Sequence, residues 1–482
     1  MSVGNCAIIG GMLFRRLFLQ REIFLVCGAL ALAGCAAPTP TLTPVPILTT
    51  PPATLVSELN AQIFPDSAQS FKHVSERAPF TLTFTANVSG GVPPYTYEWD
   101  FDGDNKTDSA EISPPPFVYE SPRAYNAALV VTDASGQDIR VTRRIVAFDA
   151  PQMPNWKYGI TAHLERRRPP YYPTLADVER AAKLMQDAGV QVVRMDFNWD
   201  MLNPTREEWK FEDYDNVVKI ARAHDLQILG VIDYASWWAS SAQDSNDWRV
   251  RLYSEPLNDY DFARYTYEVV NHFKDDVQVW QIWNEPNTEG FWKPQPNPAR
   301  YVSLLQEAYL AAKYADPNAV VIFAGMSSNG IEGNDDSGLA SNFIERAYMA
   351  GARGYFDAMA IHPYMLPNGG IETLRAKISA TRALMNKSGD ENIPLWLTEI
   401  GVPTDAPWWS TAPLQSEDDA ANWLGEVYTK LWDLTPTIFW YELQDRDIGD
   451  DPEGHFGILR ADFSPKRAYE VLKGIAGSKS AK

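Results

Sequence analysis

The feature that most restricts the fold is an eightfold alternation of strand-like and helix-like segments that begins near Tyr158. Each strand-like segment is a short apolar run, and each is followed by a longer stretch with helical periodicity. This alternation predicts an α/β fold, a (β/α)8 TIM barrel over residues 151–482. The expected strands are Tyr158 to His163, Val190 to Phe197, Leu226 to Asp233, Val277 to Asn284, Ala319 to Gly325, Phe356 to His362, Pro394 to Ile400 and Thr437 to Glu442.

The segment Thr174 to Gly189 illustrates the helical pattern. Thr174 is a candidate N-cap, Asp177 stands three residues later as in a capping box, and Gly189 ends the segment. One face of the expected helix is apolar, through Val178, Ala181, Ala182 and Met185.

Two of the expected strands end in a glutamate. The strand from Val277 ends at Glu285, because the proline that follows cannot continue the strand. The strand from Pro394 ends at Glu399. In a TIM barrel the C-terminal ends of the strands meet at one mouth, which holds the active site. Two carboxylates at this mouth predict acid/base or nucleophilic chemistry on an acid-labile bond.

Further polar and aromatic residues stand at the other strand ends. A single one is often a helix cap or a loop anchor, but a whole set at one mouth favours a functional site. The histidines show no paired metal-ligand spacing, so we interpret those in the set as hydrogen-bonding groups and expect no catalytic metal. The set comprises His163, Arg194, Asp196, Asp233, Asn284, His362, Tyr364, Trp440 and Glu442.

Tryptophans are frequent in the loops on the same side of the expected barrel. Flat apolar rings suit the C–H faces of sugars, although packing within the loop is the alternative for each of them. We expect Trp440 to be the platform under a reacting sugar. The loop tryptophans are Trp237, Trp238 and Trp248 after the third strand, Trp292 after the fourth, and Trp408 and Trp409 after the seventh.

Residues 1–34 have the features of an export signal. Arginines precede an apolar run from Ile23 to Ala33 that is too short to span a bilayer. The run ends in Gly34 and Cys35, which resembles a lipobox and implies a bacterial lipoprotein anchored through Cys35 at the cell surface or in the periplasm. A short buried helix is the alternative, and both Sec and twin-arginine export stay open. Residues 35–64 are expected to be a Pro/Thr-rich linker.

Residues 65–150 are expected to form a small all-β, immunoglobulin-like sandwich. Phe80 to Val88 alternates between apolar side chains and Thr or Asn, as a half-buried strand does. The segments Gly91 to Asp104 and Tyr125 to Asp133 resemble the polycystic-kidney-disease (PKD) type of domain. Within the first, aspartates have the oxygen-ligand spacing of a calcium loop, with turn aspartates as the alternative. The calcium candidates are Asp100, Asp102 and Asp104, continued by Asp108 and Glu111 just after that segment.

The strand-end residues of the barrel together resemble those of the clan A retaining glycoside hydrolases. The chain after the fourth strand, with Asn287, Gly290 and Phe291, is most similar to glycoside hydrolase family 39 and its cellulase-like relatives. The resemblance implies that Glu285 is the general acid/base and Glu399 the nucleophile. It also implies substrate-binding or supporting roles for Arg194, Asn284, His163, His362, Tyr364, Trp440, Trp292 and Asp196.

The expected function is therefore a retaining β-glycosidase that hydrolyses an extracellular polysaccharide or oligosaccharide by double displacement, without a cofactor and as a monomer. The alternatives are a non-catalytic carbohydrate-binding or adhesive lipoprotein and a transglycosylase that uses the same intermediate. A formal net charge of −20 argues against nucleic acid and strongly anionic polymers as partners, unless a local basic pocket overrides it. The sugar, its linkage and the choice between internal and terminal cleavage stay open.

Overall fold

The computed structural model describes residues 57–327, 340–365, 367–405 and 414–477. The expected signal segment, Cys35, most of the linker, Trp408 and Trp409 lie outside the described residues. None of the helices in these ranges is long and apolar enough to cross a membrane.

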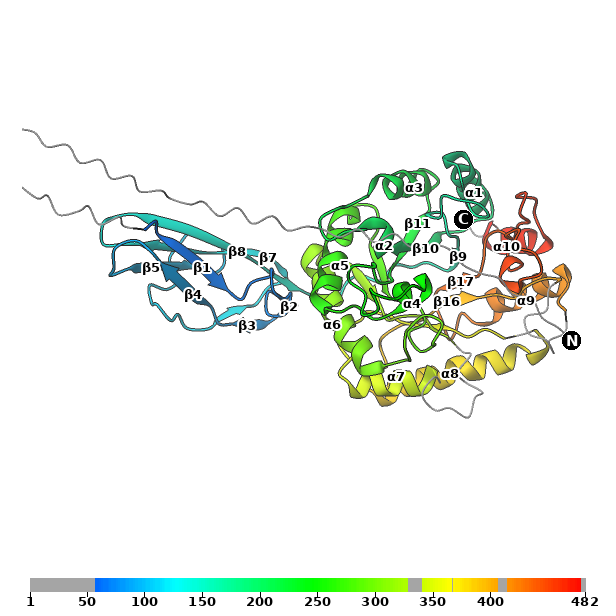
Figure 1. The fold of residues 1–482 in the computed structure, drawn as a ribbon. Helices are drawn as coiled ribbons and strands as arrows, with labels where there is room; N and C mark the ends of the chain where they lie inside the picture. Colours follow the sequence, from blue (N-terminus) through cyan, green and yellow to red (C-terminus); the bar gives the residue numbers. More distant parts are fainter. Residues whose placement is uncertain (1–56, 328–339, 366, 406–413, 478–482) are drawn as a thin grey trace, which may run out of the picture. The chain divides into compact units, whose positions relative to one another are not determined.

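The C-terminal part is a (β/α)8 barrel, as the eightfold alternation predicted (Figure 1). Its parallel strands follow the order β13-β12-β11-β10-β9-β17-β16-β15-β14. The sheet closes because Phe323 N–H donates to the Ala358 carbonyl at 2.9 Å and Asp357 N–H to the Val321 carbonyl at 2.7 Å. The strands are β9 (Tyr158–Thr161), β10 (Val192–Asn198), β11 (Gln227–Asp233), β12 (Val279–Ile282), β13 (Val320–Ile322), β14 (Met326–Ser327), β15 (Met359–His362), β16 (Leu395–Ile400) and β17 (Ile438–Trp440).

Eight longer helices surround these strands (Figure 1). They are α1 (Leu175–Asp187), α3 (Glu212–Ala223), α5 (Asp259–Phe273), α6 (Pro298–Ala315), α7 (Ala340–Met349), α8 (Ile371–Lys387), α9 (Glu417–Lys430) and α10 (Arg467–Gly477). The capping box predicted for the first of them is confirmed, because Thr174 Oγ1 accepts from Asp177 N–H and the Asp177 carboxylate accepts from Thr174 N–H. The short helices α2 (Trp199–Leu202) and α4 (Trp248–Tyr253) lie in the loops after β10 and β11.

Side chains from alternate strand positions fill the barrel. Because successive residues of a strand point to opposite faces, the remaining positions pack outward against the helices. In β17, for example, Phe439 belongs to the interior layer, whereas Ile438 and Trp440 belong to the layer under the helices. The interior layer consists of Val192, Leu229, Val231, Val279, Val320, Ile322, Ala358, Ala360, Trp396 and Phe439.

The N-terminal part is rich in β-strands, as predicted. Its four-stranded sheet has the order β2-β8-β7-β5, and two further pairs, β1-β4 and β3-β6, complete it. Trp99, Leu129 and Ile145 are fully buried in its core. The strands are β1 (Asn60–Phe64), β2 (Ser75–Arg77), β3 (Phe80–Leu82), β4 (Thr85–Ser89), β5 (Thr96–Asp100), β6 (Phe117–Tyr119), β7 (Arg123–Thr132) and β8 (Asp138–Phe148).

The structure differs from two of the expected boundaries in this part. Phe80 to Val88 forms two strands rather than one, because β3 pairs with β6 while β4 pairs with β1, so the chain changes partner at Thr83 and Phe84. The side chains still alternate as predicted, with Phe80, Leu82 and Phe84 buried. Strand β1 lies within the segment that was expected to be linker, so ordered structure begins before residue 65.

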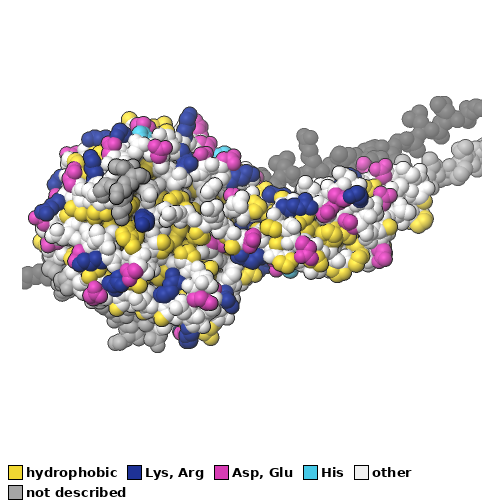
Figure 2. Space-filling view, turned by 180° about the vertical axis from the view of Figure 1, so that it is seen from behind, with side chains coloured by type: hydrophobic (Ala, Val, Ile, Leu, Met, Phe, Trp, Pro, Cys, Tyr) yellow, Lys and Arg dark blue, Asp and Glu magenta, His cyan; other side chains and the backbone are white. Residues whose placement is uncertain are grey.

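Acidic and basic side chains are interspersed on the face of the molecule that Figure 2 shows, with patches of hydrophobic side chains between them. The chain has 62 Asp and Glu against 42 Lys and Arg. On the face shown, the acidic excess does not form one large block of negative charge.

Candidate active site

Glu285 stands on an unusual backbone segment just after β12. Trp283 and Glu285 have φ angles of +70° and +45°, a backbone region that residues other than glycine rarely adopt. Trp283 N–H donates to the Ile232 carbonyl at 3.0 Å, and Glu285 N–H donates to the Gly325 carbonyl at 3.1 Å. The neighbouring strands therefore hold the strained segment in place, and Glu285 remains only 8% exposed.

The surroundings of Glu285 favour its protonated form. Burial raises the pKa of Glu285 to about 7, although the charge of Arg194 and a hydrogen bond with Ser327 oppose the shift. Nδ1 of His362 lies 2.8 Å from Glu285 Oε1. Burial lowers the pKa of His362 to about 4, so its ring is neutral near neutral pH. Glu285 thus carries a proton up to about pH 7 beside an uncharged imidazole.

His362, at the end of β15, is fixed from two sides. Its Nε2 lies 3.0 Å from Thr398 Oγ1. The ring also packs directly on Gly325, where a Cβ atom would come within 2.0 Å of Nε2. A side chain at position 325 would therefore displace His362 from Glu285, which explains why this position requires glycine.

Glu399, on β16, has a different environment. Arg194 Nη1 donates to Glu399 Oε1 at 2.7 Å, and the Tyr364 hydroxyl donates to Oε2 at 2.7 Å. Arg194 is 2% exposed and also donates from Nη2 to Asn284 Oδ1 at 2.8 Å. Such charge-assisted hydrogen bonds stabilise an ionised carboxylate. One carboxyl group of the pair is thus kept protonated, and the other is held beside a positive charge.

The two carboxyl groups lie close together. One oxygen of Glu285, one oxygen of Glu399 and a ring nitrogen of His362 all lie within 4.8 Å of one another. The structure thus brings together six residues predicted for the mouth: Arg194, Asn284, Glu285, His362, Tyr364 and Glu399.

His163 and Asp196 belong to a buried ionic cluster next to this site. Asp196 Oδ2 lies 3.3 Å from His163 Nδ1 and accepts from Arg166 Nη2 at 3.0 Å. Burial and Arg166 oppose a charge on His163, but the carboxylates of Asp196 and Glu165 outweigh them and raise the pKa of His163 to about 9. Glu165 and Arg166 could not be predicted as site residues from the sequence, because they lie in a loop without periodicity.

Two carboxylate groupings in the barrel have the spacing of metal ligands. One consists of Glu285, His362 and Glu399, and the other includes Asp196. In each, a guanidinium already binds a carboxylate: Arg194 binds Glu399 at 2.7 Å, and Arg166 binds Asp196 at 3.0 Å. These positive charges disfavour a cation, so the described geometry fits acid/base chemistry better than metal binding.

The acidic residues expected for a calcium loop in the N-terminal part are only partly brought together. Asp100 and Asp102 lie within 4.8 Å of Asp108, whereas Asp104 is not part of this group. The Asp100 carboxylate accepts from two backbone N–H groups of the turn, and Asp104 pairs with Lys106 at 2.5 Å. The carboxylate contacts found here are those of turn aspartates.

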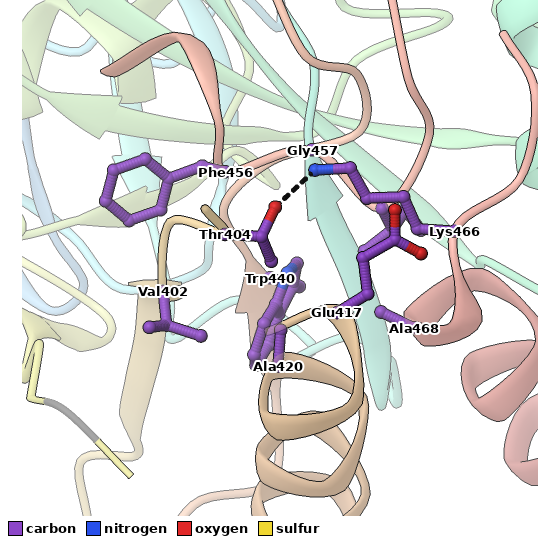
Figure 3. Close-up of a pocket in the computed structure, with 10 residues that line it drawn as sticks. Val402, Thr404, Glu417, Ala420, Trp440, Phe456, Gly457, Lys466 and Ala468 are labelled. Atoms are coloured by element: carbon purple, nitrogen blue, oxygen red, sulfur yellow. Dashed lines mark hydrogen bonds between the residues drawn. The ribbon is translucent and has the colours of Figure 1, made fainter. Parts of the chain in front are cut away.

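The prediction that Trp440 is the sugar platform is wrong. Trp440 is 1% exposed and lies outside the barrel interior, among Val402, Ala420 and Ala468 (Figure 3). Alternation along β17 causes this, since Phe439 points inward and Trp440 outward. The next residue, Tyr441, reaches the mouth instead: its ring centroid lies 6.2 Å from that of Tyr364 and 6.3 Å from that of His163.

Trp292 also takes no part in a sugar-binding surface. It is 1% exposed and packs against Trp283 at 5.0 Å and Tyr301 at 6.2 Å between ring centroids. Its role in the structure is to support Trp283, the residue two positions before Glu285. In contrast, Trp237 and Trp248 are 54% and 52% exposed.

A cleft of about 1030 Å³ opens on the same side of the barrel as the strand ends that carry the two glutamates. It is lined by the loops that follow β9, β10 and β11, and both exposed tryptophans, Trp237 and Trp248, contribute to its wall. Tyr234, at the inner end of the cleft, lies 5.4 Å from Trp283 between ring centroids and hydrogen-bonds to Asn284. The cleft therefore leads to the residue that precedes Glu285.

Comparison with known proteins shows that this architecture is similar to that of glycoside hydrolases. The family described as Glycosyl hydrolase family 53 matches residues 155–394, just under half of the chain, which includes Glu285 but stops before Glu399. With the barrel and the paired glutamates at its mouth, this match shows that the chain has the fold of the clan A glycoside hydrolases.

Individual proteins similar to this chain include a xylanase, two family 39 enzymes and a β-xylosidase. Endo-1,4-beta-xylanase B of Thermotoga neapolitana is 24% identical over 153 residues, and the chain spans only 40% of its length. A family 39 glycoside hydrolase from Bacteroides cellulosilyticus WH2 is similar in structure, with a TM-score of 0.51, 20% identity, and coverage of 84% of this chain and 81% of the other. A GH39 enzyme from Xanthomonas axonopodis pv. citri gives a TM-score of 0.53 at 16% identity, with 68% of each chain covered.

A monomeric beta-xylosidase from Caulobacter crescentus CB15 gives a TM-score of 0.51 at 15% identity, and the alignment covers 68% of this chain and 69% of the other. At these identities the structural similarities establish the fold alone.

Proposed function

We propose that the protein is a retaining β-glycosidase that acts on an extracellular polysaccharide or oligosaccharide. The observation that carries this proposal is the separation of at most 4.8 Å between an oxygen of Glu285 and one of Glu399. Retaining enzymes hold their two carboxyl groups roughly 5 to 5.5 Å apart, whereas inverting enzymes need about 6.5 to 9.5 Å to admit a water molecule. The short distance favours the retaining mechanism.

The residues divide the reaction into two steps. In the first, the Glu399 carboxylate forms a bond to the anomeric carbon while the glycosidic C–O bond breaks, and the leaving oxygen takes the proton of Glu285. In the second, the ionised Glu285 removes a proton from water, the water oxygen bonds to the anomeric carbon, and Glu399 leaves. A pKa of about 7 suits Glu285 to both tasks, because it can give and accept a proton near neutral pH.

The neighbouring groups support these steps. Arg194 and Tyr364 orient the attacking carboxylate through hydrogen bonds of 2.7 Å each. Asn284, held by Arg194, has its side chain beside Glu285 and is suited to bind the 2-hydroxyl of the reacting sugar. Tyr441 takes over the role first assigned to Trp440, since its ring lies at the mouth.

Product analysis tests the proposal. We expect the protein to release sugars from at least one polymer in a panel of xylans, β-glucans, mannans and bacterial exopolysaccharides, and NMR to detect the β-anomer first. Xylans come first because the relatives include a xylanase and a β-xylosidase. First release of the α-anomer would contradict retention. If the native protein and Glu399→Gln bind a polymer equally and neither cleaves it, the result would favour a binding protein. If the products depend on the concentration of an added acceptor, the result would favour a transglycosylase.

We further propose that Cys35 carries a lipid and anchors the protein to a bacterial membrane, with the β-rich part, a PKD-type domain in this proposal, as a spacer. The support is the apolar run and Gly34 before Cys35, together with the Pro/Thr-rich residues after it. Cells fed a radioactive fatty acid are expected to label the native protein but not Cys35→Ser. Cys27→Ser is the matched control and should keep the label, and equal labelling of all three would refute lipidation at Cys35.

A further inference from the structure

We propose that the cleft lined by the loops after β9, β10 and β11 binds the carboxylate of an acidic sugar, so that the substrate is a mainly neutral glycan that carries uronic acid units. This inference rests on the proposed glycosidase function and specifies its substrate class. The cleft residues that carry it are Arg167, Arg168 and Arg251, together with Trp237 and Trp248.

The cleft reverses the charge balance of the chain. Four arginines line it against two aspartates, Asp200 and Asp213, although acidic residues outnumber basic ones by 62 to 42 in the whole sequence. Such a local excess of positive charge in a cleft attracts an anionic group. One of the four, Arg166, is already bound to Asp196, so three arginines are available to a ligand.

These three arginines form no ion pair with any described residue. Arg167 donates to the carbonyls of Tyr172 and Pro173, and its buried Nη1 has no hydrogen-bond partner among the described residues. Arg251 donates from Nη1 to the Ser245 carbonyl at 2.6 Å. The side chain of Arg168 forms no hydrogen bond with any residue in the described part of the chain. Arg168 and Arg251 thus keep N–H groups for a carboxylate, which the planar fork matches in geometry, whereas the unpartnered Nη1 of Arg167 is buried.

The aromatic residues of the same cleft indicate that the anion belongs to a sugar. Trp237 and Trp248 expose about half of their surface there, and Arg249 lies over the Trp248 ring at 4.6 Å. Indole rings suit the apolar faces of pyranoses, while arginines suit an acidic substituent at the sugar edge. A uronic acid unit presents both features in one residue.

The overall charge limits how acidic the glycan is. With a net charge of −20 the protein repels a polymer that carries a charge on every unit, because each added negative charge increases the long-range repulsion. A single carboxylate in contact with arginines gains short-range hydrogen bonds that outweigh this repulsion. A neutral backbone with occasional uronic acid units therefore fits the cleft and the surface together.

Paired ligands test the inference. Inactive full-length Glu399→Gln protein is titrated with glucuronoxylan, a glucuronate-bearing arabinogalactan and a glucuronate-bearing bacterial exopolysaccharide, each also in a form whose carboxyl groups have been reduced to alcohols. We expect at least one acidic polymer to bind roughly tenfold more tightly than its reduced form, since the reduced form cannot accept charge-assisted hydrogen bonds from the arginines. Equal affinity within every pair, or no binding of any acidic polymer, would overturn the inference.

Variants locate the effect in the cleft. Adding Arg168→Gln to the inactive protein is expected to lower the affinity for the acidic form about tenfold and to leave that for the reduced form unchanged. Arg251→Gln should act in the same direction. Arg467→Gln, which makes the same charge change at a 56% exposed side chain on α10, is the control and should alter neither affinity. Equal losses in Arg168→Gln and Arg467→Gln would refute a specific site.

These measurements are independent of turnover. If the acidic ligands bind selectively but the native protein cleaves none of the polymers, the glycosidase proposal fails while the acidic-sugar site stands. If the native protein cleaves neutral and acidic forms alike and the inactive protein binds both equally, the glycosidase proposal stands and the acidic-sugar inference fails.

Discussion

Replacing Glu399 with alanine is expected to lower kcat/KM by at least ~10⁴-fold, because the variant has no carboxylate to form the covalent intermediate. Azide should restore part of the activity on substrates with activated leaving groups, since the anion can occupy the space of the missing carboxylate. The product is expected to be a glycosyl azide of inverted configuration, which NMR identifies.

Folding must be checked separately for this variant. Arg194, which is 2% exposed, loses its carboxylate partner, and breaking such a buried pair typically costs about 3 to 5 kcal/mol. Glu399→Gln, which keeps hydrogen-bond acceptors, should be equally inactive and melt closer to the native protein. Glu391→Ala, at an exposed position, is the matched control and should keep full activity. Substantial activity in Glu399→Gln would exclude this residue as the nucleophile.

Replacing Glu285 with glutamine is expected to lower kcat/KM by about 10²- to 10⁴-fold for natural glycosides, because the leaving oxygen then departs without a proton. Substrates with activated aryl leaving groups should lose less in the first step. In the native protein, kcat/KM should fall above about pH 7 as Glu285 ionises, and this limb should be absent in Glu285→Gln. An unchanged pH profile in the variant would assign the limb to another group.

The same substitution is expected to stabilise the fold at alkaline pH. The pKa of Glu285 is about 7 in the folded state against 4.5 for the ordinary side chain. Its contribution to stability is therefore fully present below pH 4.5 and is lost as the pH rises to about 7, a difference of about 3 kcal/mol. Glu285→Gln should melt at a higher temperature than the native protein at pH 8 and at a similar one at pH 4. Calorimetry at the two pH values measures this difference.

Most of the barrel could be predicted because its sequence pattern is local. Strand runs and helical faces are decided by the spacing of apolar residues, and the capping box at Thr174 is recognised from two residues. The places where the prediction differed depend on distant partners. The change of pairing partner at Thr83 and Phe84 is an example, because β3 pairs with β6 whereas β4 pairs with β1.

The candidate site was predictable where a polar residue ends a strand and points into the barrel. Glu285, Glu399 and His362 satisfy this condition, and the structure brings them together with Arg194 from within β10. The prediction that Trp440 is the sugar platform failed because its position in the strand directs the side chain outward. The alternation with Phe439 would have indicated this direction.

The remaining groups of the site come from the turn after the last strand and from irregular loops. Tyr441 lies in that turn. Arg166 and Arg168 lie in the loop after β9, and Arg251 lies on the short helix α4 within the loop after β11, and the periodicity of the sequence does not determine the path of either loop.

The strained segment from Trp283 to Glu285 has a consequence for attempts to improve the protein. Two left-handed residues cost of order 1 to 3 kcal/mol each, and the buried carboxyl adds its own penalty above neutral pH. A directed-evolution screen that selects only for heat resistance would therefore enrich substitutions at these positions that relax the segment and abolish the chemistry. Selection for activity after a heat challenge retains the segment and directs stabilising changes to the rest of the barrel.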